Sequence, residues 1–147
     1  MTSLTTSLRL LTSALAMSFA TVPAWTQEAA PVPALTLELN GAQPSDKGCR
    51  LTFLVNNNLG ADLSKAAFEI ALFNEAGVVD RLTVLDFKDL PAGKTKVTRF
   101  DLAGTDCAKV SRVLINSATE CAGTGIEPNA CMRKLKTDTK TGIVFGV

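Results

Sequence analysis

Histidine and tyrosine are both absent from the 147-residue chain. Without histidine the chain cannot build a Ser–His–Asp or Cys–His nucleophilic site, and it has no imidazole to bind a metal ion. Without tyrosine it also lacks the phenol groups that serve as nucleophiles or proton donors in catalysis. These two absences point away from an enzyme, so we expect no catalytic residues, no cofactor-binding residues and no metal ligands.

A marked excess of charge is also missing. Lys and Arg number 15 against 14 Asp and Glu, which gives a formal net charge of +1 at pH 7. Proteins that bind nucleic acid normally carry a basic excess that neutralises phosphates, so we expect no nucleic-acid partner. No apolar run reaches the roughly 20 residues of a membrane-spanning helix, so we also expect no membrane span in the mature chain.

The first 24 residues have the pattern of a secretory signal peptide. Arg9 is their only charged residue, and residues 10–22 are mainly apolar. Val22 and Ala24 are small residues at positions −3 and −1 of a cleavage site after Ala24. Cleavage after Thr26 is the alternative. We expect this segment to be removed during export, which makes the mature chain periplasmic or secreted.

Residues 25–34 include the sequence AAPVP and predict a flexible leader, followed by a folded domain over residues 35–147. In this domain, apolar and polar residues alternate in short segments that are bounded by Gly, Pro, Asn and Asp turns. Six such segments are predicted strands: residues 35–39, 49–56, 67–74, 78–87, 95–102 and 110–116. The pattern predicts an all-β fold, an antiparallel β-sandwich of six or seven strands.

The pattern changes after the sixth segment. Residues 121–131 predict a Gly- and Pro-containing loop, and residues 128–135 have room for one short helix. Residues 139–147 either form a closing strand or do not pair with the sheet, and the sequence pattern leaves both alternatives open.

Four cysteines in an exported chain predict two disulfides, for which three pairings exist. If successive strands run alternately up and down, Cys49 and Cys107 reach the same end of the sandwich. Cys121 then lies at the opposite end, with Cys131 close to it in sequence. We therefore expect the pairs Cys49–Cys107 and Cys121–Cys131, the second of which closes a C-terminal loop. A zinc site is the disfavoured alternative, because the spacing of the last two cysteines is too wide for a zinc knuckle.

Several apolar residues fall on the outward side of the predicted strands. The predicted core consists of the residues on the inward side: Leu37, Leu39, Leu51, Phe53, Val55, Phe68, Ile70 and Leu72. Leu54 and Phe73 then point outward, which makes them the candidates for a partner face. Two adjacent apolar pairs must each send one more residue outward: Val84–Leu85 and Leu114–Ile115. The alternatives are that other segments cover these residues, or that an edge strand accepts a partner's strand.

The segment FEIALFNEAGVV resembles the FxLYD-type immunoglobulin-like domain of exported bacterial proteins. The matching residues are Phe68, Ile70, Leu72, Phe73 and Gly77, followed by the LPAG turn at residues 90–93. Phe73 stands where that family has a tyrosine. The chain from residue 35 to 147, with its CRLTF and LINSATEC segments and its cysteines, is also similar to uncharacterised exported alphaproteobacterial proteins. The resemblance implies an immunoglobulin-like sandwich outside the cytoplasm and carries no catalytic residues.

The sequence therefore predicts a non-enzymatic binding or interaction module of the bacterial envelope, with another envelope protein as its partner. The alternative class is a periplasmic chaperone-like or structural protein. A hydrolase is the least favoured class, because histidine and tyrosine are missing. No motif specifies the oligomeric state.

Overall fold

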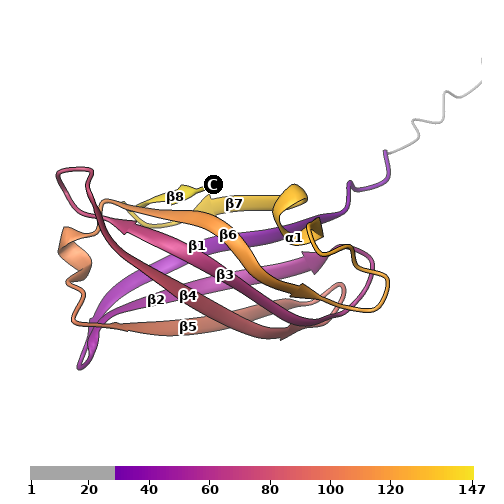
Figure 1. Cartoon of the computed structure of the whole chain (residues 1–147), viewed down its shortest axis with the longest axis horizontal. Coiled ribbons are helices and arrows are strands. Elements are labelled where there is room, and N and C mark those ends of the chain that lie inside the picture. Colours follow the sequence, from indigo (N-terminus) through magenta and orange to yellow (C-terminus); the bar gives the residue numbers. More distant parts are fainter. Residues whose placement is uncertain (1–28) are drawn as a thin grey trace, which may run out of the picture. The chain divides into compact units, whose positions relative to one another are not determined.

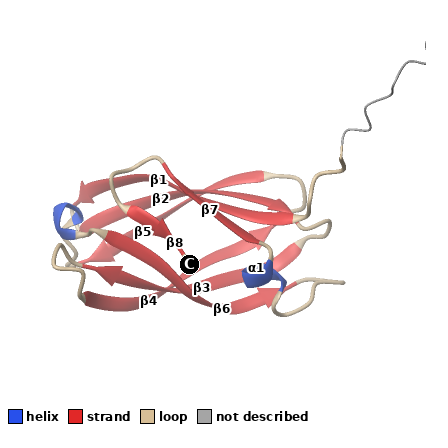
Figure 2. Ribbon diagram, turned by 90° about the horizontal axis from the view of Figure 1, so that it is seen from above, coloured by secondary structure: helices blue, strands red, loops and turns tan. Residues whose placement is uncertain are grey.

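Among residues 29–147, which the computed structural model describes, eight strands form two sheets of four strands each (Figure 1). The first sheet has the strand order β5-β2-β1-β7, and the second sheet has the order β4-β3-β6-β8. The two sheets form the two layers of a sandwich (Figure 2). The strands and helices are β1 (Ala34–Ser45), β2 (Gly48–Asn58), β3 (Leu63–Phe73), β4 (Val79–Leu90), β5 (Thr95–Ala103), the 3-10 helix η1 (Cys107–Lys109), β6 (Arg112–Ala122), α1 (Ala130–Arg133), β7 (Leu135–Thr139) and β8 (Val144–Gly146).

The all-β sandwich predicted from the alternating pattern is confirmed. The six predicted segments overlap β1 to β6 in order, and α1 is the expected short helix. β2 pairs with β5 in one sheet and β3 pairs with β6 in the other, which is the pairing of immunoglobulin-like sandwiches. The unit Pro31–Val147 contains the whole sandwich. The predicted signal peptide, residues 1–24, lies outside the described residues.

The C-terminal segment adds two strands that pair in parallel, whereas the sequence predicted antiparallel pairing and one closing strand at most. β7 pairs with β1, and β8 pairs with β6. Backbone hydrogen bonds anchor β7 at both ends, from Leu35 N to Lys134 O and from Lys140 N to Leu39 O, each at 2.9 Å. β7 and β8 therefore lie along one side of the sandwich, which Figure 2 shows facing the viewer.

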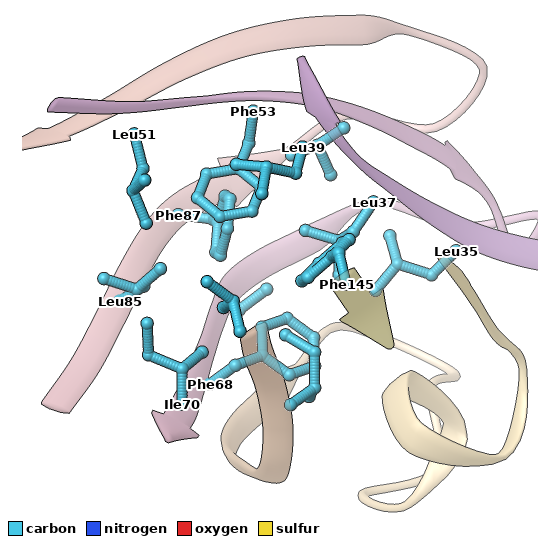
Figure 3. Packing of buried hydrophobic residues seen from close by; sticks show 14 of the residues in the cluster. Leu35, Leu37, Leu39, Leu51, Phe53, Phe68, Ile70, Leu85, Phe87 and Phe145 are labelled. Carbon is cyan, nitrogen blue, oxygen red and sulfur yellow. The ribbon is translucent and has the colours of Figure 1, made fainter. Parts of the chain in front are cut away.

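The core between the sheets is organised around a cluster of phenylalanine rings (Figure 3). The Phe53 ring lies 5.6 Å from Phe87, 6.0 Å from Phe100 and 5.5 Å from Phe145, measured between centroids. Phe87 also contacts Phe68, with 5.9 Å between the centroids. Most of these pairs are edge-to-face, which is a favoured geometry for aromatic rings. All eight residues predicted for the core are at most 1% exposed. The sequence-based prediction of the inward side of the strands is thereby confirmed.

Asn57, near the end of β2, is a buried polar side chain that holds two loops together. Its Nδ2 donates to Ala61 O at 2.9 Å and to Leu90 O at 2.7 Å, while its Oδ1 accepts from Leu59 N at 3.0 Å. The residue is only 1% exposed, and a buried amide is tolerated because its groups are hydrogen-bonded in this way. Asn57 thus fixes the β2–β3 connection against the end of β4.

Both disulfides seen in the described part of the chain have the predicted pairing. Cys49, in β2, is bonded to Cys107, in η1, across a sequence separation of 58. Cys121, in β6, is bonded to Cys131, in α1, across a separation of 10. Disulfides of this kind persist in oxidising compartments, which fits a protein outside the cytoplasm.

Replacing Phe68 by alanine tests the core directly. Phe68 is fully buried, so Phe68→Ala should lower the free energy of unfolding by about 3–5 kcal/mol through lost burial and a residual cavity. Urea denaturation followed by circular dichroism measures this change. A loss below about 1 kcal/mol would mean that the ring is not in the core.

The two disulfides should contribute unequally to stability. The Cys49→Ser/Cys107→Ser variant should lose roughly 4 kcal/mol, and the Cys121→Ser/Cys131→Ser variant roughly 3 kcal/mol, because the longer loop restricts the unfolded chain more. Each disulfide contains one fully buried cysteine, Cys49 in the first and Cys131 in the second. The cost of burying a serine hydroxyl is therefore matched between the two variants. Thermal unfolding of the two variants provides the comparison, and equal losses in melting temperature would contradict the expectation.

Candidate interaction face

The two residues predicted for a partner face, Leu54 and Phe73, lie on opposite sides of the sandwich. Leu54 stands on β2 between the buried residues Phe53 and Val55, so it points outward from the first sheet. Phe73 follows the buried Leu72 on β3, so it points outward from the second sheet. Leu54 and Phe73 therefore do not lie on one face, because their strands belong to different sheets.

The outer surface of the second sheet carries a largely apolar surface, which we call the apolar face. It consists of Val79, Leu82 and Val84 on β4, Ala71 and Phe73 on β3, Leu114 on β6, and Val144 on β8. Val79, Leu82, Val84 and Val144 are 50%, 56%, 51% and 59% exposed. The adjacent pairs behave as predicted, since Leu85 and Ile115 are buried while Val84 is exposed and Leu114 half-buried.

The strand register makes the apolar face contiguous. Ala71 stands opposite Leu82 on one side and opposite Leu114 on the other, which forms a central row across three strands. Phe73 stands opposite Val79 in the next row. Residues directly opposite each other on neighbouring strands have their side chains in contact distance, so these residues form one surface rather than scattered exposed side chains.

Two charged residues stand within this surface, one on each side of the central row. Arg112 lies opposite Phe73, and its guanidinium carbon is 5.4 Å from the centroid of the Phe73 ring. Glu69 lies opposite Val84 and accepts a hydrogen bond from the side-chain amide of Asn116. Within residues 29–147, neither Arg112 nor Glu69 has an ion-pair partner.

The outer surface of the first sheet is polar by contrast. Arg50 and Asp101 form a two-pronged ion pair, with Nε–Oδ1 at 2.8 Å and Nη2–Oδ2 at 3.0 Å. The hydrogen bond from Arg50 holds the pKa of Asp101 below its ordinary value. Leu54 faces Val97 on the neighbouring strand, and this small apolar contact lies among polar neighbours such as Thr52. The first sheet therefore presents a solvated polar surface, on which Arg50 and Asp101 are paired while Arg99 and Lys136 have no ion-pair partner within residues 29–147.

The sandwich has one closed side and one open side. β7 and β8 cover the closed side, while β4 and β5 are the edge strands of the open side. Two long side chains cross the open side, because Arg81 Nη1 donates to Ala103 O and Lys96 Nζ donates to Asp89 O, both at 2.8 Å. Cationic side chains along an edge are a common protection against strand addition, so the geometry favours the apolar face over an edge as the docking surface.

A cleft of about 720 Å³ lies at the end of the sandwich where the β2–β3 and β4–β5 connections meet. Its polar groups already hold these loops, since Asp62 Oδ1 accepts from Ala92 N at 2.7 Å and Ser64 Oγ donates to Ala122 O at 3.2 Å. In the part of the chain that the structure describes, no group of three or more potential metal ligands comes together. The cleft is lined by the two carboxylates of Asp62 and Asp89, and within the described residues no third potential metal ligand joins them.

No family model, no curated protein and no solved structure matches this chain. None of the helices within the described residues is long and apolar enough to cross a membrane.

The sequence analysis missed Val79, Leu82 and Val144 as members of the face. A signal for Leu82 was present in the sequence. Leu85 and Phe87 occupy the inward positions of the same strand, so Leu82 and Val84 occupy outward positions. Val144 had no such signal, since its position depends on the parallel pairing of the short strand β8.

The assignment of the two sides of β4 can be tested by placing one charge on each side. Leu82→Glu should change the free energy of unfolding of the monomer by less than about 0.5 kcal/mol, because Leu82 is exposed. The matched variant Leu85→Glu should prevent folding, because Leu85 is 2% exposed and its carboxylate would be buried without a partner. Circular dichroism and urea denaturation distinguish the two, and similar losses would contradict the assignment.

Proposed function

We propose that the mature chain is a non-enzymatic interaction module of the bacterial envelope that docks a protein partner through the apolar face. The single observation that carries this proposal is the apolar outer surface of the second sheet, where four exposed residues (Val79, Leu82, Val84 and Val144) surround the half-buried Phe73 and Leu114 and the buried Ala71. Contiguous exposed apolar surfaces are rare on monomers and are typical of protein-association sites.

A location outside the cytoplasm supports this assignment. The signal-peptide pattern of residues 1–24 and the two disulfides seen in the described residues both fit export to an oxidising compartment. The resemblance to FxLYD-type immunoglobulin-like domains points in the same direction. We therefore propose a periplasmic or secreted protein.

The form of the surface favours a protein over a small molecule. Ligand pockets are concave and enclose most of a small ligand, whereas the apolar face spreads across four neighbouring strands of one sheet. Apolar side chains at its centre and charges at its margins, Arg112 and Glu69, match the usual arrangement of a protein interface.

Cross-linking in intact cells tests this proposal, with a matched pair of variants. Leu82→Glu places a charge in the apolar face, and Val97→Glu places one on the first sheet. The two residues are 56% and 57% exposed, and both lie on edge strands. We expect one dominant cross-linked protein for the wild type and for Val97→Glu, and its loss for Leu82→Glu.

Two results would contradict the proposal. Recovery of no protein would mean that the apolar face has no stable partner, and equal recovery by both variants would place the interaction elsewhere. Recovery of many unfolded envelope proteins would instead support the chaperone-like alternative.

A further inference from the structure

The two charges of the apolar face have opposite signs and lie at opposite ends of it. Arg112 stands in the row of Phe73, on one side of the central row formed by Leu82, Ala71 and Leu114. Glu69 stands two positions before Ala71 on β3, which places it on the other side. The apolar face is thus an apolar centre with a positive end and a negative end.

The other charges on the strands of this surface are paired, hydrogen-bonded across the open side or line a cleft at the end of the sandwich, and Glu75 lies beyond the strands in the β3–β4 turn. Lys65 is paired with Glu120, and Lys88 is paired with Asp86, each at 2.7 Å. Asp80 lies in the bulge of β4 and lines a cleft at the end of the sandwich. A partner is therefore oriented mainly by Arg112 and Glu69.

Both charges are held in place before any partner arrives. The guanidinium of Arg112 lies over the Phe73 ring, and its Nε is buried without a hydrogen-bond partner. The carboxylate of Glu69 is held by the amide of Asn116. Side chains that are already ordered lose less conformational entropy on binding, so these two charges are suited to form specific ion pairs.

Resting on the proposed function, we infer that the occupant of the apolar face is a second copy of this chain. The copies pack face to face about a two-fold axis that lies between the two faces and is perpendicular to the line from Glu69 on β3 to Arg112 on β6, so it runs obliquely across the strands. Such an axis exchanges the two ends of the face, so the negative end of each copy lies over the positive end of the other. Glu69 of each copy then meets the partner's Arg112, and the two ion pairs flank an apolar centre.

The remaining surfaces offer no comparable match to a second copy. On the outer surface of the first sheet, Arg50 is paired with Asp101, and Lys140 is paired with both Asp138 and Glu38. These charges are satisfied within one chain, and the two cations of this surface that have no ion pair within residues 29–147, Arg99 and Lys136, carry the same sign and offer no opposite charge to a second copy. Face-to-face packing of two twisted sheets is also an established arrangement, with strands inclined by about 30°.

Sedimentation velocity of the mature protein, purified after export of the full-length chain, tests this inference. Over a series of protein concentrations, we expect the wild type and Val97→Glu to form a dimer. Leu82→Glu should remain a monomer, because its charge would be buried at the centre of the contact. Circular dichroism checks that each variant is folded.

Charge reversal tests the orientation of the dimer. Glu69→Arg and Arg112→Glu each place like charges opposite each other and should raise the dissociation constant of the dimer about tenfold or more. The double variant Glu69→Arg/Arg112→Glu restores opposite charges and should recover most of the affinity. If Arg112→Glu does not fold, Glu69→Arg at its half-buried position still provides the test.

Each contrary result has a separate meaning. A wild type that stays monomeric at all concentrations overturns the inference, yet the proposed function survives if Leu82→Glu still loses a cross-linked envelope protein. A dimer that persists in Leu82→Glu overturns the assignment of the apolar face. A dimer that is unaffected by both single reversals overturns the two-fold arrangement.

Discussion

The packing of the two sheets around Phe53 and Phe87 is the contact on which the rest of the structure depends. Phe53 projects from the first sheet and Phe87 from the second, and their rings meet at 5.6 Å (Figure 3). Because side chains alternate along a strand, burying these rings fixes the side to which every neighbouring residue points. A slip of one residue in β4 would turn Leu85 outward and Leu82 inward.

The same constraint creates the difference between the two outer surfaces. On the first sheet, the outward positions carry polar and charged residues, such as Arg50 and Asp101, that pair with each other. On the second sheet, they carry Leu82, Val84 and Phe73, so an apolar surface remains after the core is complete. Such a surface favours association with another protein, because association removes it from water.

Local patterning predicted most of the fold but not the composition of the interaction face. Alternation predicted β1 to β6 and the core, because these features depend on nearby sequence. The alternating direction of successive strands predicted both disulfides, even though Cys49 and Cys107 are 58 residues apart. β7 was missed because LKTDT owes its strand conformation to pairing with the distant β1. Alternation gives the side of a strand and not the sheet to which the strand belongs, so it did not separate Leu54 from Phe73. The register across four strands was needed to bring Phe73, Leu82 and Val144 together.

Photo-cross-linking from the apolar face in intact cells tests the central claim most directly. A photoreactive amino acid would replace Leu82 in one variant and Val97, of equal exposure on the first sheet, in the other. We expect a protein adduct from position 82 and none from position 97. If the occupant is a second copy, the adduct from position 82 has the mass of two mature chains. Adducts from neither position, or equal adducts from both, would contradict it.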